Sequence, residues 1–211
     1  MSQGPYSSLN LGYHVGDEIS DVDENRRKLT EIFGSTIYMN QIHGDTVILV
    51  DAALSTTPRA DALVTQEKNI SLAVLVADCI PVLLWDQNTS CVAAAHVGRR
   101  GLVNGIALKV VDVMAKLGSQ GITAEFGPSI CGNCYEVGED VFRQVTSTHP
   151  KAAFRAAKFD FALDLPGALT SALEELGVDV INSNICTVES KSHFSYRRDG
   201  ITGRSAGVIS L

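Results

Sequence analysis

The sequence lacks any apolar run long enough to cross a membrane. A transmembrane helix needs roughly 18 or more consecutive apolar residues, and the best candidate, residues 70–85, is interrupted by Asp78. Residues 1–20 also lack a basic start followed by an apolar segment, so we expect no signal peptide. The sequence therefore indicates no membrane partner.

The chain also has no excess of basic residues, and its number of cysteines is odd. Seventeen Lys and Arg residues face 24 Asp and Glu residues, which gives a net charge of −7 and argues against nucleic acid as a partner. Five cysteines are an odd number in a chain of 211 residues, which is too large to need disulfides for its stability. We therefore expect free thiols and a cytoplasmic location.

No internal repeat, low-complexity tract or long linker divides the chain. Hydrophobic residues make up 45% and charged residues 19% of it, which allows a sizeable core and excludes general disorder. The length favours one domain, residues 1–211. Predicted strands and helices alternate irregularly, so we expect an α+β fold in which mixed β-sheets are layered with flanking helices.

The apolar patterning predicts most of the elements. Apolar, β-branched runs predict strands over 46–50, 70–76, 81–85, 91–95, 124–126 and 178–188, the last as one strand or a pair. Helical spacing of apolar residues predicts helices over 21–33, 102–117, 138–145 and 165–176. Residues 1–16 are predicted to form a loop, and 194–211 two strands joined by a turn at Asp199-Gly200.

Reactive side chains interrupt the apolar strands at three places. His43 precedes a strand, Asp78 and Cys79 lie between two buried strands, and His96 closes a third. Taken singly, a hydrogen-bonded histidine and a small buried thiol are the simpler explanations. Taken together, two histidines and a cysteine could form a three-ligand zinc site, whose open fourth position is typical of catalytic zinc.

Cys79 and His96 permit a second chemistry. A cysteine activated by a nearby histidine can attack an acyl or amide carbon. Sequence spacing does not separate a thiolate that binds zinc from one that pairs with an imidazolium. A metal-free Cys79–His96 hydrolase or deamidase is therefore the alternative to the zinc site.

Two arginine-rich segments are candidate anion sites. Arg100 lies in a glycine-flanked loop at the start of the strongest predicted helix, where backbone amides and a guanidinium group can bind an anion together. Arg198 lies in a tail segment, 196–204, that holds three arginines. The alternatives are a solvated turn and a charged hairpin edge.

Cys131 and Cys134 form a Cys-x-x-Cys pair. A structural zinc would need a second pair, which Cys91 and Cys186 do not form, and a redox dithiol would begin a helix after a strand. The sequence therefore gives this pair no role.

Short motifs over nearly the whole chain resemble one family. They are GPYSSLNLGYHVGD (4–17), QIHG (41–44), ADALVT (60–65), ADCIP (77–81), AAHVGRRG (94–101), GP (127–128) with CYEV (134–137), and SYRRDGITGR (195–204). In order and spacing they resemble the YfiH-like family, long called multicopper polyphenol oxidoreductases or laccase-domain proteins and now associated with purine nucleoside phosphorylase and adenosine deaminase activities.

The resemblance implies a site and a reaction. It implies that His43, Cys79 and His96 bind zinc, and that the enzyme phosphorolyses adenosine, inosine, guanosine and methylthioadenosine and deaminates adenosine. Purine nucleosides and phosphate are then the partners, with Asp78 as the candidate that moves protons and Arg100, helped by Arg198, as the phosphate ligand. The older name implies copper, but five histidines cannot fill several copper sites.

The sequence departs from the family at two places. Arg99 replaces the usual Trp before Arg100, and the family's upstream strand with its Arg-x-Gly-Gly-x-Ser segment has no counterpart before Gly4. We therefore expect the first strand of the family to be missing or the start to be truncated. A copper-binding phenol oxidase and a non-enzymatic, zinc-stabilised interaction domain are the remaining alternatives.

Overall fold

The computed structural model describes residues 2–51 and 56–211. Its helices are α1 (Ile19–Phe33), α2 (Arg99–Asn104), α3 (Ile106–Lys116), α4 (Glu139–Thr148), α5 (Leu165–Glu174) and α6 (Tyr196–Asp199). Its strands are β1 (Thr36–Ile37), β2 (Val47–Val50), β3 (Ala62–Thr65), β4 (Ser71–Val76), β5 (Ile80–Asp86), β6 (Cys91–Val97), β7 (Thr123–Phe126), β8 (Ala153–Phe154), β9 (Ala162–Leu163), β10 (Asp179–Asn182) and β11 (Ser205–Ser210).

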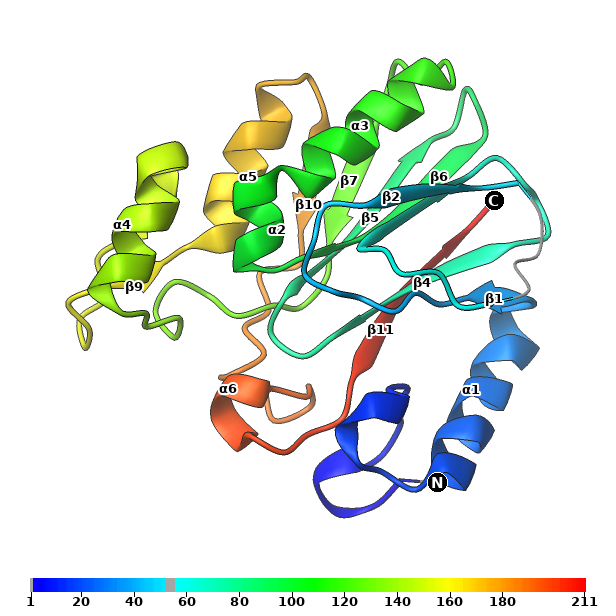
Figure 1. Cartoon of the computed structure of the whole chain (residues 1–211), viewed down its shortest axis with the longest axis horizontal. Coiled ribbons are helices and arrows are strands. Elements are labelled where there is room, and N and C mark those ends of the chain that lie inside the picture. The colour runs from blue at the N-terminus through cyan, green and yellow to red at the C-terminus, as the bar shows by residue number, and fades with distance from the viewer. Residues whose placement is uncertain (1, 52–55) are drawn as a thin grey trace.

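A mixed six-stranded sheet forms the centre of the molecule, in the order β10-β7-β5-β6-β3-β2 (Figure 1). The hairpin β5–β6 is antiparallel and pairs Ile80 with Val97 and Asp86 with Cys91. The outer pairs β2–β3 and β7–β10 are parallel. The start of β5 and the end of β6 therefore meet at one edge of the sheet.

A smaller sheet, β1-β4-β11, packs on one face of the large sheet. Along β5, Leu83 and Trp85 belong to the apolar cluster shared with β4, whereas Val82 and Leu84 belong to the cluster shared with the helices. This alternation is the two-residue period of a strand that is buried on both faces. The central strands are for that reason continuously apolar.

Helices cover both outer faces of this sandwich. Side chains of α2, α3 and α5 pack on the free face of the large sheet. On the opposite side, Leu29 of α1 packs with Leu75 and Val208 of the small sheet. The predicted α+β class, with mixed sheets and flanking helices, is confirmed.

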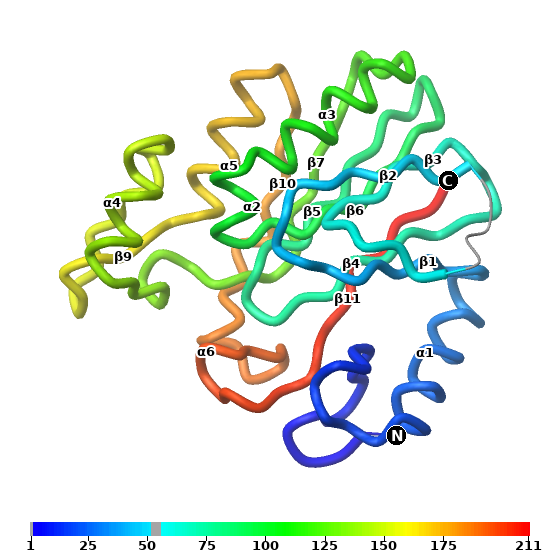
Figure 2. The backbone as a smooth tube through the Cα atoms, in the orientation of Figure 1, coloured from blue at the N-terminus to red at the C-terminus, as the bar shows by residue number. Residues whose placement is uncertain are grey.

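The loop of residues 4–17 and the segment that leads into β11 lie side by side, although the two chain termini lie far apart (Figure 2). Figure 2 shows β11 running beside β4, and the loop of residues 4–17 lying next to the segment that leads into β11. Arg204 donates its backbone N–H to Asn10 Oδ1, and Leu11 donates its backbone N–H to the Arg204 carbonyl. Both terminal segments therefore contribute to one region of the surface.

Several predicted elements are confirmed and others are wrong. The strands predicted at 46–50, 70–76, 81–85, 91–95 and 124–126 are present, but β3 was not predicted. The helix predicted over 102–117 begins at Arg99 and is divided at Gly105, whose φ of 71° is left-handed. The strand predicted over 178–188 ends at Asn182.

The strand predicted at the start of the tail is wrong. Residues 196–199 form the short helix α6, because the Ser195 side chain accepts a hydrogen bond from the Arg198 backbone N–H and caps the first turn. The final strand, β11, is present as predicted.

Candidate active site

His43, Cys79 and His96 converge on one point, with ligand atoms that all lie within 4.8 Å of one another. His43 comes from the loop before β2, Cys79 from the junction of β4 and β5, and His96 from β6. The two imidazole rings meet edge to face, with centroids 4.7 Å apart. The pairing of the start of β5 with the end of β6 brings Cys79 to His96.

The backbone at this point is unusual. His43 and Asp78 have φ values of 56° and 90°. Residues other than glycine rarely adopt such positive φ angles. A Cβ atom at Gly98 would lie 2.9 Å from Cys79 Sγ. A glycine is therefore required where the chain passes the thiol.

Asp61 holds both histidines. Its fully buried carboxylate accepts hydrogen bonds from the backbone N–H groups of His43 (2.9 Å) and Gly44 (2.7 Å), and its Oδ1 lies 2.9 Å from His96 Nδ1. Because an ionised carboxylate only accepts hydrogen bonds, it leaves His96 Nε2 for the cluster. The one sequence signal for this role is a carboxylate directly before an apolar strand, and the site predicted from the sequence does not include Asp61.

The cluster shifts the protonation of its members. Burial of Cys79 opposes ionisation, but hydrogen bonds with His43 and His96 lower the pKa of the thiol to about 6. Burial also opposes the charged form of His96, but Asp61 and Cys79 raise its pKa to about 9. The thiol is thus readily ionised, as both a metal ligand and a nucleophile must be.

The donor set fits a metal ion. One thiolate and two imidazoles suit a borderline ion such as zinc, and a site with three protein donors would leave a fourth position for water or substrate. The structure supports a metal site here.

The cluster lies in a cleft of about 850 Å³. Four of the five tyrosines and three arginines line it, together with Asp78 and the three donors. The guanidinium group of Arg26 lies 4.1 Å from the Tyr13 ring centroid and 3.8 Å from that of Tyr38. The tyrosines and arginines of the lining, none of which the sequence assigned individually to the site, are Tyr13, Tyr38, Tyr135, Tyr196, Arg26, Arg197 and Arg204.

The predicted site residues are only partly brought together. Asp78 lines the cleft, and its carboxylate accepts hydrogen bonds from Thr187 Oγ1 (2.6 Å) and the Arg197 backbone N–H (2.7 Å). Arg100 is exposed on α2 and does not line the cleft. The Arg198 guanidinium group donates to Asp199 and to the carbonyl groups of residues 187, 188, 190 and 193.

Neighbouring arginines of the tail face the cleft instead. Arg197 lies over the Tyr135 ring, 5.1 Å from its centroid. Burial lowers the pKa of Arg204, while Cys79 and Asp78 oppose that shift electrostatically. The tail is therefore the correct segment for cationic lining, but the residues that the structure places in the cleft are Arg197 and Arg204.

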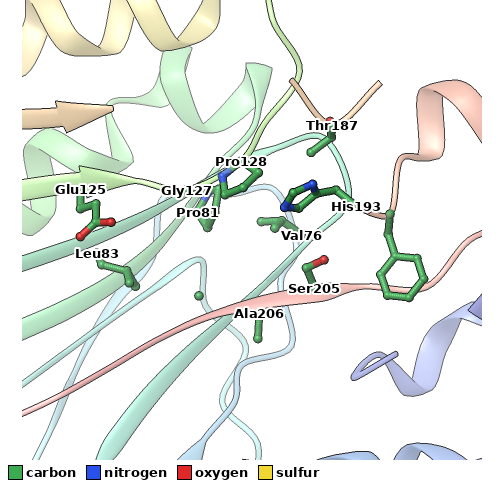
Figure 3. A pocket seen from close by; sticks show the side chains of 12 residues that line it. Val76, Pro81, Leu83, Glu125, Gly127, Pro128, Thr187, His193, Ser205 and Ala206 are labelled. Atoms are coloured by element: carbon green, nitrogen blue, oxygen red, sulfur yellow. The ribbon is translucent and has the colours of Figure 1, made fainter. Parts of the chain in front are cut away.

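A second cavity, of about 90 Å³, lies between the two sheets. Figure 3 shows Pro81 and Leu83 of β5 on one side, Val76 of β4 beside Ser205 and Ala206 of β11 on another, and His193 from the loop before α6. Its lining is mainly apolar and includes none of the three converging donors. We therefore assign the chemistry to the larger cleft.

Comparison with known proteins identifies the family. The family model described as multi-copper polyphenol oxidoreductase laccase matches residues 1–211. The chain belongs to this family. A Streptomyces coelicolor relative named purine nucleoside phosphorylase is 44% identical and is matched over 100% of this chain and 91% of its own length. Escherichia coli purine nucleoside phosphorylase YfiH is 35% identical, over 100% and 89%.

Solved structures of laccase-family relatives agree with the fold. Neisseria meningitidis NMB0706, of the DUF152 family, superposes with a TM-score of 0.91 at 40% identity, over 100% of this chain and 89% of its own. YlmD of Geobacillus stearothermophilus gives 0.90 at 32%, over 99% and 87%. The resemblance drawn from the sequence motifs is confirmed. Among the described residues, no helix is both long and apolar enough to span a bilayer.

Proposed function

We propose that this protein is a zinc-dependent purine nucleoside phosphorylase that acts on adenosine, inosine, guanosine and methylthioadenosine and also deaminates adenosine. The observation that carries the proposal is the set of three converging donors in a cleft lined by tyrosines and arginines. The names of the relatives support phosphorolysis. Five free thiols accord with a cytoplasmic enzyme.

His43, Cys79 and His96 would hold the zinc. Zinc in a three-ligand site supplies Lewis acidity, which stabilises negative charge that develops on a substrate or on water. Asp61 keeps His96 and the His43 loop in position through the bonds described above. The chain's own contribution is thus a pre-arranged donor set.

The rest of the cleft matches the other two reactants. Tyrosine rings offer flat apolar faces on which a purine can stack. Arg197 and Arg204 can bind phosphate and place one of its oxygens near ribose C1′. That oxygen bonds to C1′ as the bond to the purine nitrogen breaks, and the purine leaves with the electron pair and takes up a proton. Asp78, which lines the cleft, is our candidate for moving that proton.

The phosphate ligand can be tested with matched variants. We expect Arg197→Ala and Arg204→Ala to raise the KM for phosphate about 10-fold or more, the scale of a lost charge-assisted hydrogen bond. Our prediction from sequence for Arg100 and Arg198 is tested by the same substitution at those positions. A larger KM effect at Arg100 than at Arg197 would restore the prediction from sequence.

The reaction itself is tested by chromatography on metal-quantified protein. Inosine should give hypoxanthine and ribose 1-phosphate only when phosphate is present, and adenosine should give adenine with phosphate and inosine without it. Cys79→Ala should abolish both reactions, while Cys91→Ala, a buried thiol outside the cluster, should preserve them. Failure of the metal-loaded protein to convert any of these nucleosides would refute the proposal.

One observation favours a second candidate, a metal-free Cys79–His96 hydrolase or deamidase. The pKa of Cys79 is about 6 and that of His96 about 9, as in a thiolate–imidazolium pair. A chelator separates the two candidates, because it should inactivate a zinc enzyme and leave a cysteine nucleophile active. A Cys79 thioester acyl-enzyme, trapped by acid quench during turnover and seen by intact mass, would support the hydrolase.

A further inference from the structure

We propose a second metal site, in which Cys131, Cys134, Cys186 and Glu189 hold a zinc ion with four protein ligands. Their ligand atoms all lie within 4.8 Å of one another. None of the four lines the cleft that holds His43, Cys79 and His96. The site is therefore separate from the proposed catalytic centre and independent of the proposed function.

Two turns of the same kind supply the four ligands. Cys131 and Cys134 are three residues apart, and the Cys131 carbonyl accepts the backbone N–H groups of Cys134 and Tyr135, both at 3.0 Å. Cys186 and Glu189 are also three residues apart, and the Cys186 carbonyl accepts the Ser190 backbone N–H at 2.9 Å. Paired ligands at this short spacing are typical of structural zinc sites.

Backbone pairing holds the two turns together without help from an ion. Ser129 and Cys186 form a parallel bridge, in which the Ser129 N–H donates to the Ile185 carbonyl and the Thr187 N–H donates to the Ser129 carbonyl, both at 3.1 Å. The bridge continues the parallel pairing of β7 with β10. The ligand positions are thus already fixed by the fold.

The donor chemistry and spacing fit zinc. Three thiolates and one carboxylate favour zinc over calcium or magnesium, which prefer oxygen ligands. Cys134 Sγ lies 3.6 Å from a carboxylate oxygen of Glu189. A tetrahedron with a Zn–S bond of about 2.3 Å and a Zn–O bond of about 2.1 Å has an S···O edge of about 3.6 Å.

The site would stabilise one wall of the cleft. Ile130 and Tyr135, on either side of the first turn, both line the cleft. In the second turn, Thr187 donates its hydroxyl to Asp78, and its carbonyl accepts the Arg198 guanidinium group. An ion that joins the two turns would fix the positions of Asp78 and α6 at the wall of the cleft.

Metal content tests the site directly. Protein purified from zinc-supplemented, reducing buffer should hold two zinc ions per chain by mass spectrometry. Cys186→Ala and Cys79→Ala should each hold one, the double variant none, and the Cys91→Ala control two. Equal zinc in Cys186→Ala and wild type would overturn the proposal, as would zinc-free Cys79→Ala protein. A disulfide among the three cysteines of the zinc-supplemented protein, seen as the loss of two hydrogens by intact mass, would also overturn it.

A second test uses Glu189→Gln, a conservative substitution that should leave the fold intact. In Cys79→Ala protein loaded with cobalt(II), the remaining site should show thiolate charge-transfer absorption and tetrahedral d–d bands. Glu189→Gln should weaken cobalt binding by more than the roughly 10- to 100-fold that loss of an outer partner costs, while Glu174→Gln on α5 should leave it unchanged. An octahedral spectrum, or equal affinity in the two variants, would contradict the assignment. Neither test uses nucleoside turnover, so its outcome is independent of the proposed activity.

Discussion

Asp61 and Asp86 are fully buried carboxylates near opposite ends of the large sheet, and they are held in nearly the same way. Asp61 accepts backbone N–H groups from Ile42, His43 and Gly44. Asp86 accepts them from three residues of the loops beside it, Asn88, Gln120 and Gly121. Each carboxylate therefore fixes the loops at its end of the sheet.

The difference lies in one further contact. Asp61 also bonds His96 Nδ1 and so reaches the donor cluster, whereas Asp86 fixes loops that carry no candidate ligand. In both, burial raises the pKa, but the hydrogen bonds outweigh it and the pKa is low. A buried, ionised carboxylate is thus not itself a sign of function. The groups that it holds decide its role.

The largest expected effect separates the two carboxylates by metal affinity. Asp61→Asn should weaken zinc binding by about 10- to 100-fold, because the amide no longer fixes His96 and the His43 loop. Competition with a chromogenic chelator measures the affinity. The matched Asp86→Asn protein should bind zinc like wild type. Equal zinc affinity in the two variants would remove the distinction between the carboxylates.

The next-largest expected effect is on the stability of the protein, and it belongs to Asp86 instead of Asp61. Asp86→Ala should lower the free energy of unfolding by about 1–2 kcal/mol, since three backbone donors of exposed loop residues lose a charged acceptor. Urea unfolding measures this loss. The folded fraction should retain wild-type zinc content and turnover. A loss of activity beyond the loss of folded protein would show that the Asp86 end of the sheet acts on the site.

The pH dependence of stability isolates the charge of Asp86. Its folded pKa lies below the unfolded value, so its ionisation contributes stability that is fully present above about pH 4 and is lost as the pH falls through the folded pKa. Asp86→Asn lacks this contribution. The stability difference between wild type and variant should shrink from pH 6 to pH 3 in urea titrations. A constant difference would assign the effect to shape alone.

Local patterning predicted the core of the fold and the separate parts of the site. Continuous apolar runs are sufficient to identify β4, β5 and β6, and the reactive residues stand out because they interrupt those runs. Asp61 was present as a charge before an apolar strand, but its partners come from two other segments. That role depends on which strands pair, and a single sequence does not show strand pairing.

The same reason explains why the sequence did not show which tail arginines line the cleft, or that Cys186 and Glu189 join Cys131 and Cys134. Cys186 joins Cys131 because β7 pairs with β10, and their continuations then run side by side. Arg197 and Arg198 are adjacent in sequence, yet Arg197 lines the cleft and donates to the Glu136 carbonyl, whereas Arg198 lies outside the lining and donates to the carbonyls of residues 187–193. The capped turn of α6, which Asp78 anchors through a backbone N–H, decides between them.

The smallest effect compares a glycine beside each carboxylate. Neither Gly44 nor Gly121 has a left-handed φ, so alanine reduces the entropy of the unfolded chain at both positions. At Gly121 the nearest atom to an added Cβ is 3.8 Å away, and Gly121→Ala should stabilise the protein by about 0.4–1 kcal/mol.

At Gly44 the Cβ would lie 3.4 Å from Asp61 Oδ2 and from Ile42 Cγ1, and this close contact offsets the gain in stability. Gly44→Ala should therefore leave the thermal midpoint near that of wild type and weaken zinc binding slightly, while Gly121→Ala should raise the midpoint and leave zinc binding unchanged. If both variants gained equal stability and bound zinc equally, the loop at Asp61 would be no more constrained than the loop at Asp86.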